Sequence, residues 1–120
     1  MDIKITDISS YTPKSSDIFL FDNTVWMYVF CPLGNYNLKR QKYYSSFLSL
    51  VASSHSTIFI TSLILSEFTN RYLRLDFDLW KEETQSYSAN FKSDFIGTER
   101  YRETVEAICE SLNNILRLCE

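Results

Sequence analysis

The feature that most constrains this chain of 120 residues is a pair of short apolar runs, each followed by a helix-like segment. The runs cover residues 18–21 (IFLF) and 57–60 (TIFI). Neither shows the polar alternation of a half-exposed strand, so we expect two strands that are covered on both faces. The order strand, helix, strand, helix predicts a right-handed βαβ unit with parallel strands. The expected fold class is therefore α/β.

Apolar residues at helical spacing predict the segments between and after these strands. We expect helices over residues 25–30, over 38–52, from a cap at Thr61 or Ser62 to about residue 75, and from Gly97-Thr98 onward. Pro32-Leu33-Gly34 is expected to end the first of them. Around residues 76–88 the periodicity loosens, which predicts a separate and shorter helix. Because Gly and Pro occur only twice each, helices should dominate the fold.

The chain divides into an arm and one domain. Residues 1–17 are rich in Ser, Thr and Pro and are expected to form an irregular N-terminal arm. Residues 18–120 have the length of one small domain. Two strands alone leave both sheet edges unpaired, and the last predicted helix has no Gly or Pro stop. We therefore expect a domain that is incomplete at its C-terminus.

Cysteine usage and hydropathy predict the compartment. Cys31, Cys109 and Cys119 are odd in number and contain no C-x-x-C pair, which argues against a disulfide framework or a zinc site. Residues 1–17 lack the apolar core of a signal peptide. The apolar stretch from residue 18 to 33 is too short for a membrane span and carries a charge. A cytoplasmic protein without membrane contact is expected.

Two carboxylates are predicted to meet at one edge of the sheet. Asp22 directly follows the first strand, and Glu67 lies in the opening turns of the helix after the second. The carboxyl ends of parallel strands share an edge, and like charges held close there need neutralising. Mg²⁺ or Mn²⁺ does this with oxygen ligands, and Asn23 or Thr24 is placed to add a neutral oxygen or orient a water. The alternative is that Asp22 is a helix cap and Glu67 a solvated helix residue.

These segments resemble the opening acidic motifs of the PIN-domain nucleases. The first motif is matched by residues 19–26 (FLFDNTVW) and the second by residues 58–74, which contain Leu65-Ser66-Glu67-Phe68. The resemblance extends over about residues 17–119. It implies a helix-rich, PIN-like α/β fold with a parallel sheet flanked by helices. The family's later aspartates have no counterpart here, so the C-terminal strands that complete the fold are expected to be missing.

The resemblance also implies a function, which is that of a Mg²⁺- or Mn²⁺-dependent endoribonuclease. Asp22 and Glu67 would be its catalytic residues and metal ligands, supported by Asn23, Thr24 and Arg71. Many PIN domains are toxins of toxin–antitoxin pairs, so the implied partners are an RNA substrate and an antitoxin protein. The alternative is a truncated or degenerate PIN-like module that acts in dimerisation or protein binding without catalysis. The open sheet edge and the apolar last helix predict a homodimer.

Other polar and aromatic residues are assigned structural roles, and the net charge of −3 argues against a general phosphate binder. A solvated helix face is expected for Lys39, Arg40 and Lys42. Core positions are expected for Tyr43, Tyr44 and Phe47. Pairing with Asp76 or Asp78 is expected for Arg71 and Arg74, in preference to contact with RNA.

Overall fold

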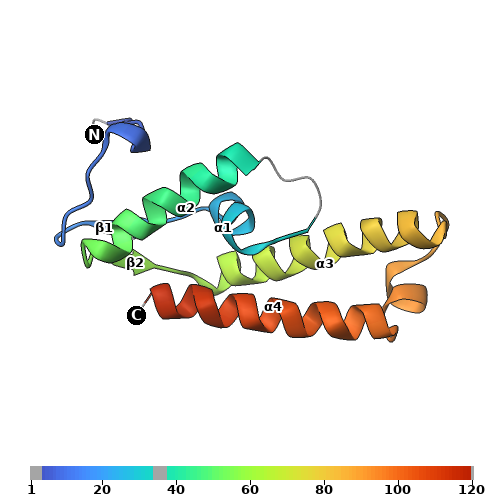
Figure 1. Cartoon of the computed structure of the whole chain (residues 1–120). Helices are drawn as coiled ribbons and strands as arrows, with labels where there is room; N and C mark the ends of the chain where they lie inside the picture. Colours follow the sequence, from blue (N-terminus) through green and yellow to red (C-terminus); the bar gives the residue numbers. More distant parts are fainter. Residues whose placement is uncertain (1–3, 34–37, 120) are drawn as a thin grey trace.

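The structure is a computed structural model that describes residues 4–33 and 38–119, with the side chain of Leu38 left out. Residues 1–3 of the expected arm and Gly34 of the expected helix break lie outside the described residues. The elements in chain order are η1 (Ile8–Ser10), β1 (Ile18–Leu20), α1 (Asn23–Phe30), α2 (Leu38–Ser53), β2 (Thr57–Phe59), α3 (Ser62–Thr84), η2 (Phe91–Phe95) and α4 (Glu99–Leu118). The fold is helix-rich and α/β, as expected (Figure 1).

The sheet consists of β1 and β2, which pair in parallel with Phe19 opposite Ile58 and Leu20 opposite Phe59. This pairing confirms the predicted strand–helix–strand unit. The strands lie at one end of the molecule beside the C-terminal end of α4, and α3 and α4 pack side by side toward the other end (Figure 1).

The two faces of the sheet differ, which corrects the expectation of strands covered on both faces. On the inner face Ile58 is buried and Phe19 is half-buried against the helices. On the outer face the side chains of Ile18, Leu20 and Phe59 are 65%, 63% and 58% exposed. The helices therefore cover one face of the sheet only. An apolar run without alternation can thus also form a strand with one face exposed to solvent.

The core forms where α1 meets the inner face of the sheet and the longer helices. Its buried side chains include Trp26, Met27, Phe47, Val51, Ile58, Phe68, Tyr72, Ile108 and Ile115. Burying large side chains of this kind stabilises the fold by about 2–3 kcal/mol each. The contributing residues recur every three or four positions along α2, α3 and α4, which explains why these helices could be located from apolar spacing.

The helix starts follow from local hydrogen bonding. The hydroxyl of Thr61 accepts a hydrogen bond from the Ile64 N–H at 3.2 Å, and that of Thr98 accepts one from the Tyr101 N–H at 3.1 Å. Each satisfies an N–H that the first helical turn leaves unpaired. The predicted cap at Thr61 is confirmed, and α4 begins at the predicted boundary, Gly97-Thr98. In the described ranges, none of the helices has the length and apolarity that a membrane span requires.

α3 continues to Thr84 as one helix, so the expected break near residue 76 is wrong. Asp76 and Phe77 are buried and provide contacts that outweigh the weak local pattern. α3 and α4 form a helical hairpin. At its end, where η2 joins the two helices, Phe95 is fully buried and its ring centroid lies 5.3 Å from that of Phe77. Gly97 then turns the chain into α4 with φ 100°, a conformation that favours glycine.

Candidate metal site

Asp22 caps α1 at the carboxyl edge of the sheet. It follows β1 with extended backbone angles, and its Oδ1 accepts a hydrogen bond from the Asn23 N–H at 2.8 Å. The side chain is exposed, and its Oδ2 has no hydrogen bond to the described residues. The capping role of Asp22 is confirmed, and its second carboxylate oxygen is not engaged by the cap.

Glu67 lies on α3, the helix that follows β2. Since Leu20 and Phe59 pair in register, the chain leaves both strands at the same edge, toward Asp22 on one side and Thr61 on the other. Glu67 follows in the second turn of α3, which packs against α1. Its side chain is exposed, and among the described residues it forms no ion pair with Arg71 one turn further on. Both predicted carboxylates therefore lie on this side of the sheet and face solvent.

Asn23 and Trp26 add buried polar atoms without partners to this corner. Asn23 is 2% exposed and Trp26 is fully buried. Among residues 4–33 and 38–119, neither the amide Oδ1 and Nδ2 of Asn23 nor the indole Nε1 of Trp26 has a hydrogen-bond partner. Leaving a buried polar group unpaired costs about 1–3 kcal/mol, so such atoms usually mark a place for a water, an ion or a ligand. Residues 23 and 26 share a face of α1.

Asp22, Asn23 and Glu67 carry oxygen atoms of the type that Mg²⁺ and Mn²⁺ bind. Asp22 and Glu67 offer carboxylate oxygens, and the unpaired amide oxygen of Asn23 is a further hard ligand next in sequence to Asp22. Thr24 is exposed on the first turn of α1. In residues 4–33 and 38–119 no three His, Cys, Asp or Glu side chains gather closely enough to hold an ion. Mg²⁺ in phosphate-processing sites is commonly held by one or two carboxylates plus waters and substrate phosphates, which suits this open arrangement.

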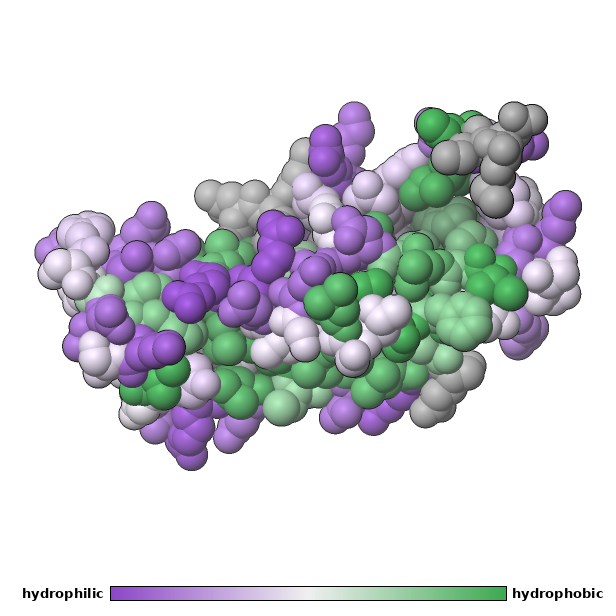
Figure 2. Space-filling model, turned by 180° about the vertical axis from the view of Figure 1, so that it is seen from behind, coloured by the Kyte–Doolittle hydropathy of each residue, from purple (hydrophilic) through white to green (hydrophobic). Residues whose placement is uncertain are grey.

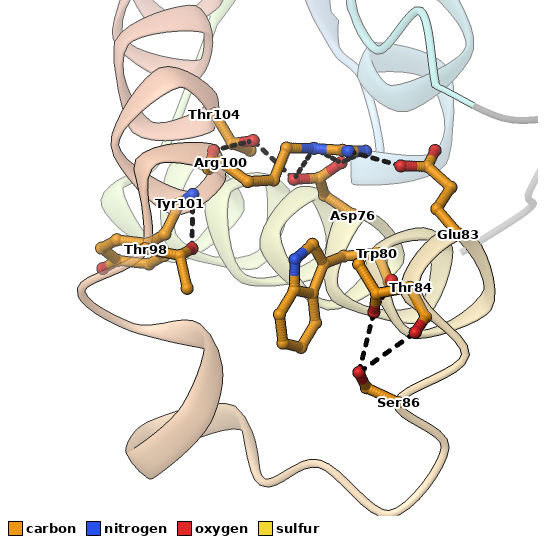
Figure 3. A network of polar contacts seen from close by, with 9 residues as sticks. All are labelled: Asp76, Trp80, Glu83, Thr84, Ser86, Thr98, Arg100, Tyr101 and Thr104. Atoms are coloured by element: carbon orange, nitrogen blue, oxygen red, sulfur yellow. Dashed lines mark hydrogen bonds and ion pairs between the residues drawn. The ribbon is translucent and has the colours of Figure 1, made fainter.

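A second carboxylate cluster, between α3 and α4, escaped the sequence interpretation. Asp76 is fully buried, and the guanidinium of Arg100 donates to it from Nη2 at 2.7 Å and from Nε at 3.1 Å (Figure 3). The Thr104 hydroxyl donates to the same carboxylate, and Arg100 Nη1 also pairs with Glu83 at 2.7 Å. The hydrogen bond to Asp76 is the main reason that the pKa of Arg100 lies above its usual value. Every group in this cluster is satisfied within the fold.

The cluster overturns the expected pairing of the α3 arginines. Asp76 pairs with Arg100, and Asp78 pairs with Lys81 at 3.4 Å. The guanidinium of Arg74 instead lies 4.0 Å from the centre of the Phe91 ring. One sequence signal was present: position 76 continues the apolar stripe through Phe68 and Tyr72 at a spacing of four residues. A carboxylate on a core stripe requires a buried partner.

Cys31 and Tyr72 lie close enough to Asp76 to sense its charge. Burial raises the pKa of the Cys31 thiol to about 11, and the Asp76 carboxylate contributes in the same direction. Burial likewise raises the pKa of Tyr72 to about 12. A thiol with so high a pKa is a poor nucleophile at neutral pH. The interior cluster is therefore structural.

Comparisons with protein-family models, with curated proteins and with solved structures found no match for the chain. The functional argument therefore depends on the motifs and the geometry described above.

Proposed function

We propose that this protein is a Mg²⁺- or Mn²⁺-dependent endoribonuclease of the PIN type. Asp22 and Glu67 hold the ion, with Asn23 as a neutral oxygen ligand. The observation that carries the proposal is the corner at the end of β1, where an exposed carboxylate with one unengaged oxygen adjoins a buried amide without partners. RNA as substrate and an antitoxin as partner rest on the likeness of the two acidic motifs to those of PIN-domain nucleases.

The bound ion would supply a water of lowered pKa and positive charge toward the phosphate that is cleaved. The Asn23 N–H fixes the direction of the Asp22 carboxylate, so its free oxygen is oriented before any ligand arrives. The exposure of Asp22 and Glu67 leaves room for the phosphate group of a substrate. Arg71, one turn beyond Glu67 and exposed, is placed to donate to the RNA backbone. Further carboxylate ligands would come from elsewhere in the assembly.

The direct test is Mn²⁺ binding by titration calorimetry. Asp22→Asn should abolish binding while preserving the fold, because Asn caps helices as well as Asp does. Glu67→Gln should lower the affinity strongly for the same loss of charge. Asp78→Asn is the matched control, since Asp78 is another exposed carboxylate on α3. An unchanged Mn²⁺ affinity in Asp22→Asn would refute the assignment.

Catalysis requires a separate measurement. Cleavage of labelled single-stranded RNA should occur with Mn²⁺, stop with EDTA and be lost in Asp22→Asn. Metal binding without cleavage would assign the site to a non-catalytic role.

A second candidate function, self-association, is favoured by the bare outer face of the sheet. Ile18, Leu20 and Phe59 are exposed there, and Figure 2 shows hydrophobic surface over the end of the molecule that carries the strands. In the part of the chain that the structure describes, each strand also pairs along one edge only. The expected mass in light scattering is twice the chain mass of 14.2 kDa, falling to the monomer mass in Leu20→Lys. Ile5→Lys, at a 93% exposed position in the arm, is the control. A monomer mass for the wild type would exclude this function.

A further inference from the structure

A cavity of about 1020 Å³ separates the N-terminal arm from α2. Residues 8–12 of the arm form one wall, and residues from Lys39 to Leu50 of α2 form the other. The arm wall is rich in hydroxyl groups, including those of Ser9, Ser10 and Thr12. The volume lies in the range typical of small-ligand sites. The cavity is distinct from the metal-binding corner, and the proposed function leaves it unexplained.

The α2 wall carries positive charge at the less favourable end of the helix. Lys39, Arg40 and Lys42 line the cavity within the first turns of α2, which has no acidic residue in its first turn. The N-terminus of a helix bears a partial positive charge, so cations there are disfavoured and a bound anion is favoured. The chain as a whole has a net charge of −3, which makes this local concentration stand out.

Aromatic rings lie beside these cations, contrary to the expectation that all three are core. Only Phe47 is buried, while Tyr43 is 40% exposed. The ring of Tyr43 meets that of Tyr44 at 5.5 Å in an edge arrangement, and Tyr44 stacks on Tyr28 at 5.6 Å. A supported and partly exposed tyrosine ring next to cations is the surface on which nucleic-acid bases stack.

Two carboxylates adjoin the arm wall and limit where an anion can lie: Asp7, and Asp17, which accepts a hydrogen bond from the Tyr11 hydroxyl at 2.6 Å. The Tyr43 hydroxyl donates to Asp7 at 2.7 Å, and the Ser9 N–H donates to the same carboxylate. The Ser9 and Tyr43 hydrogen bonds lower the pKa of Asp7, so Asp7 is ionised at neutral pH. A phosphate is therefore expected nearer Lys42 and the start of α2 than to the Asp7 side.

We infer that this cavity binds one nucleotide unit of single-stranded RNA, with the base against Tyr43 and the phosphate at the cations of α2. The ring of Phe47, which is 5% exposed, lines the cavity and packs in the core at 6.3 Å from that of Phe21. The identity of the polymer rests on the proposed function, whereas the binding itself requires no metal.

The test is fluorescence anisotropy of a labelled ten-nucleotide oligouridylate with the full chain in EDTA. Lys42→Ala should weaken binding and lower the slope of affinity against salt by about one. Tyr43→Leu should weaken binding about tenfold, while Tyr43→Phe, which keeps the ring, should bind like the wild type. Lys92→Ala is the matched control, since Lys92 is exposed on η2 and does not line the cavity.

Competition identifies what the cavity recognises. Uridine monophosphate should displace the oligonucleotide at a lower concentration than inorganic phosphate, because it carries both base and phosphate. Equal displacement by phosphate alone would overturn base stacking. No binding by the wild type, unchanged binding in Tyr43→Leu, or an equal loss in Lys92→Ala would overturn the inference.

Folding effects are separated by circular dichroism of each variant. If Tyr43→Leu is unfolded, crosslinking of 4-thiouridine RNA to the wild-type chain decides, with adducts expected on the peptide that contains Tyr43 and Tyr44. Adducts confined to other peptides would overturn the inference. If the RNA-binding test fails while Mn²⁺ binding is intact, only the proposal for the cavity is rejected. If Asp22→Asn leaves Mn²⁺ binding unchanged while RNA binding is intact, only the proposal for the metal site is rejected.

Discussion

The Asp76 cluster between α3 and α4 and the Asp22 corner at the sheet edge use the same residue type to opposite effect. Asp76 is fully buried and receives hydrogen bonds from Arg100 and Thr104. Asp22 is exposed, its side chain accepts one hydrogen bond, from the Asn23 N–H, and it adjoins the Asn23 amide, which has no partner among the described residues. A buried charge persists only when it is paired, so Asp76 belongs to the structure. Unpaired polar atoms beside an exposed charge instead indicate a place for a ligand.

The largest expected effect comes from removing the charge of the buried cluster. Asp76→Asn leaves the Arg100 guanidinium without its main anionic partner inside the helix hairpin. The free energy of unfolding should fall by about 3 kcal/mol or more, as is typical of a broken buried pair. Urea denaturation followed by circular dichroism measures it.

The comparison has a matched control on the same helix. Asp78→Asn removes an exposed ion pair with Lys81 and should cost less than about 0.5 kcal/mol. If Asp76→Asn were as mild as Asp78→Asn, the cluster would not be the structural centre that its burial indicates.

The free energy of unfolding should fall by about 2–3 kcal/mol when Cys31, which lies near the same cluster, titrates at alkaline pH. Its pKa is raised by burial from 9.0 to about 11, so the unfolded chain loses this proton first. Stability is therefore fully present below pH 9 and is lost as pH rises toward 11. Tyr72 extends the loss toward pH 12. Unfolding free energies measured from pH 8 to 11 should decline less steeply in Cys31→Ala than in the wild type.

Cys109 provides the corresponding control, since it is exposed. Cys109→Ala should reproduce the decline of the wild type. A flat wild-type profile over this range would contradict the assignment of a buried thiol.

The smallest effect, with the opposite sign, is expected at the sheet edge. Asn23→Leu replaces an amide with unpaired atoms by an apolar side chain of similar volume and should stabilise the metal-free protein by about 1 kcal/mol. The same substitution should weaken Mn²⁺ binding. Thermal unfolding with and without Mn²⁺ tests both effects, and a destabilised metal-free variant would mean that the amide is already satisfied.

Local patterns predicted much of the fold because local physics decides it. Two apolar runs gave the positions of β1 and β2, and their order gave the parallel pairing. A hydroxyl side chain before an apolar stripe identified the start of α3 at Thr61, and the Gly97-Thr98 boundary identified the start of α4. The position of Asp22 after its strand followed from the same reasoning.

What escaped prediction depends on contacts between distant residues. The length of α3 and the partner of Asp76 are set by α4, since Arg100 lies 24 positions away. The outer face of the sheet is exposed because the helices pack on the other face. The apolar sequence of a strand does not determine which of its faces the helices cover. The partner of the Tyr43 hydroxyl, Asp7 of the arm, lies 36 positions away.

The pairing of β1 with β2 has a consequence for the order in which parts of the molecule open. The strands are three residues each and are joined across α1 and α2, so their contacts close a long loop, whereas α3 and α4 are neighbours along the chain. Amide protons of the strands should exchange with solvent before those of the helical hairpin. A cation or nucleic acid held near the strands would then slow that exchange, and recognition would be coupled to the rigidity of the least protected segment.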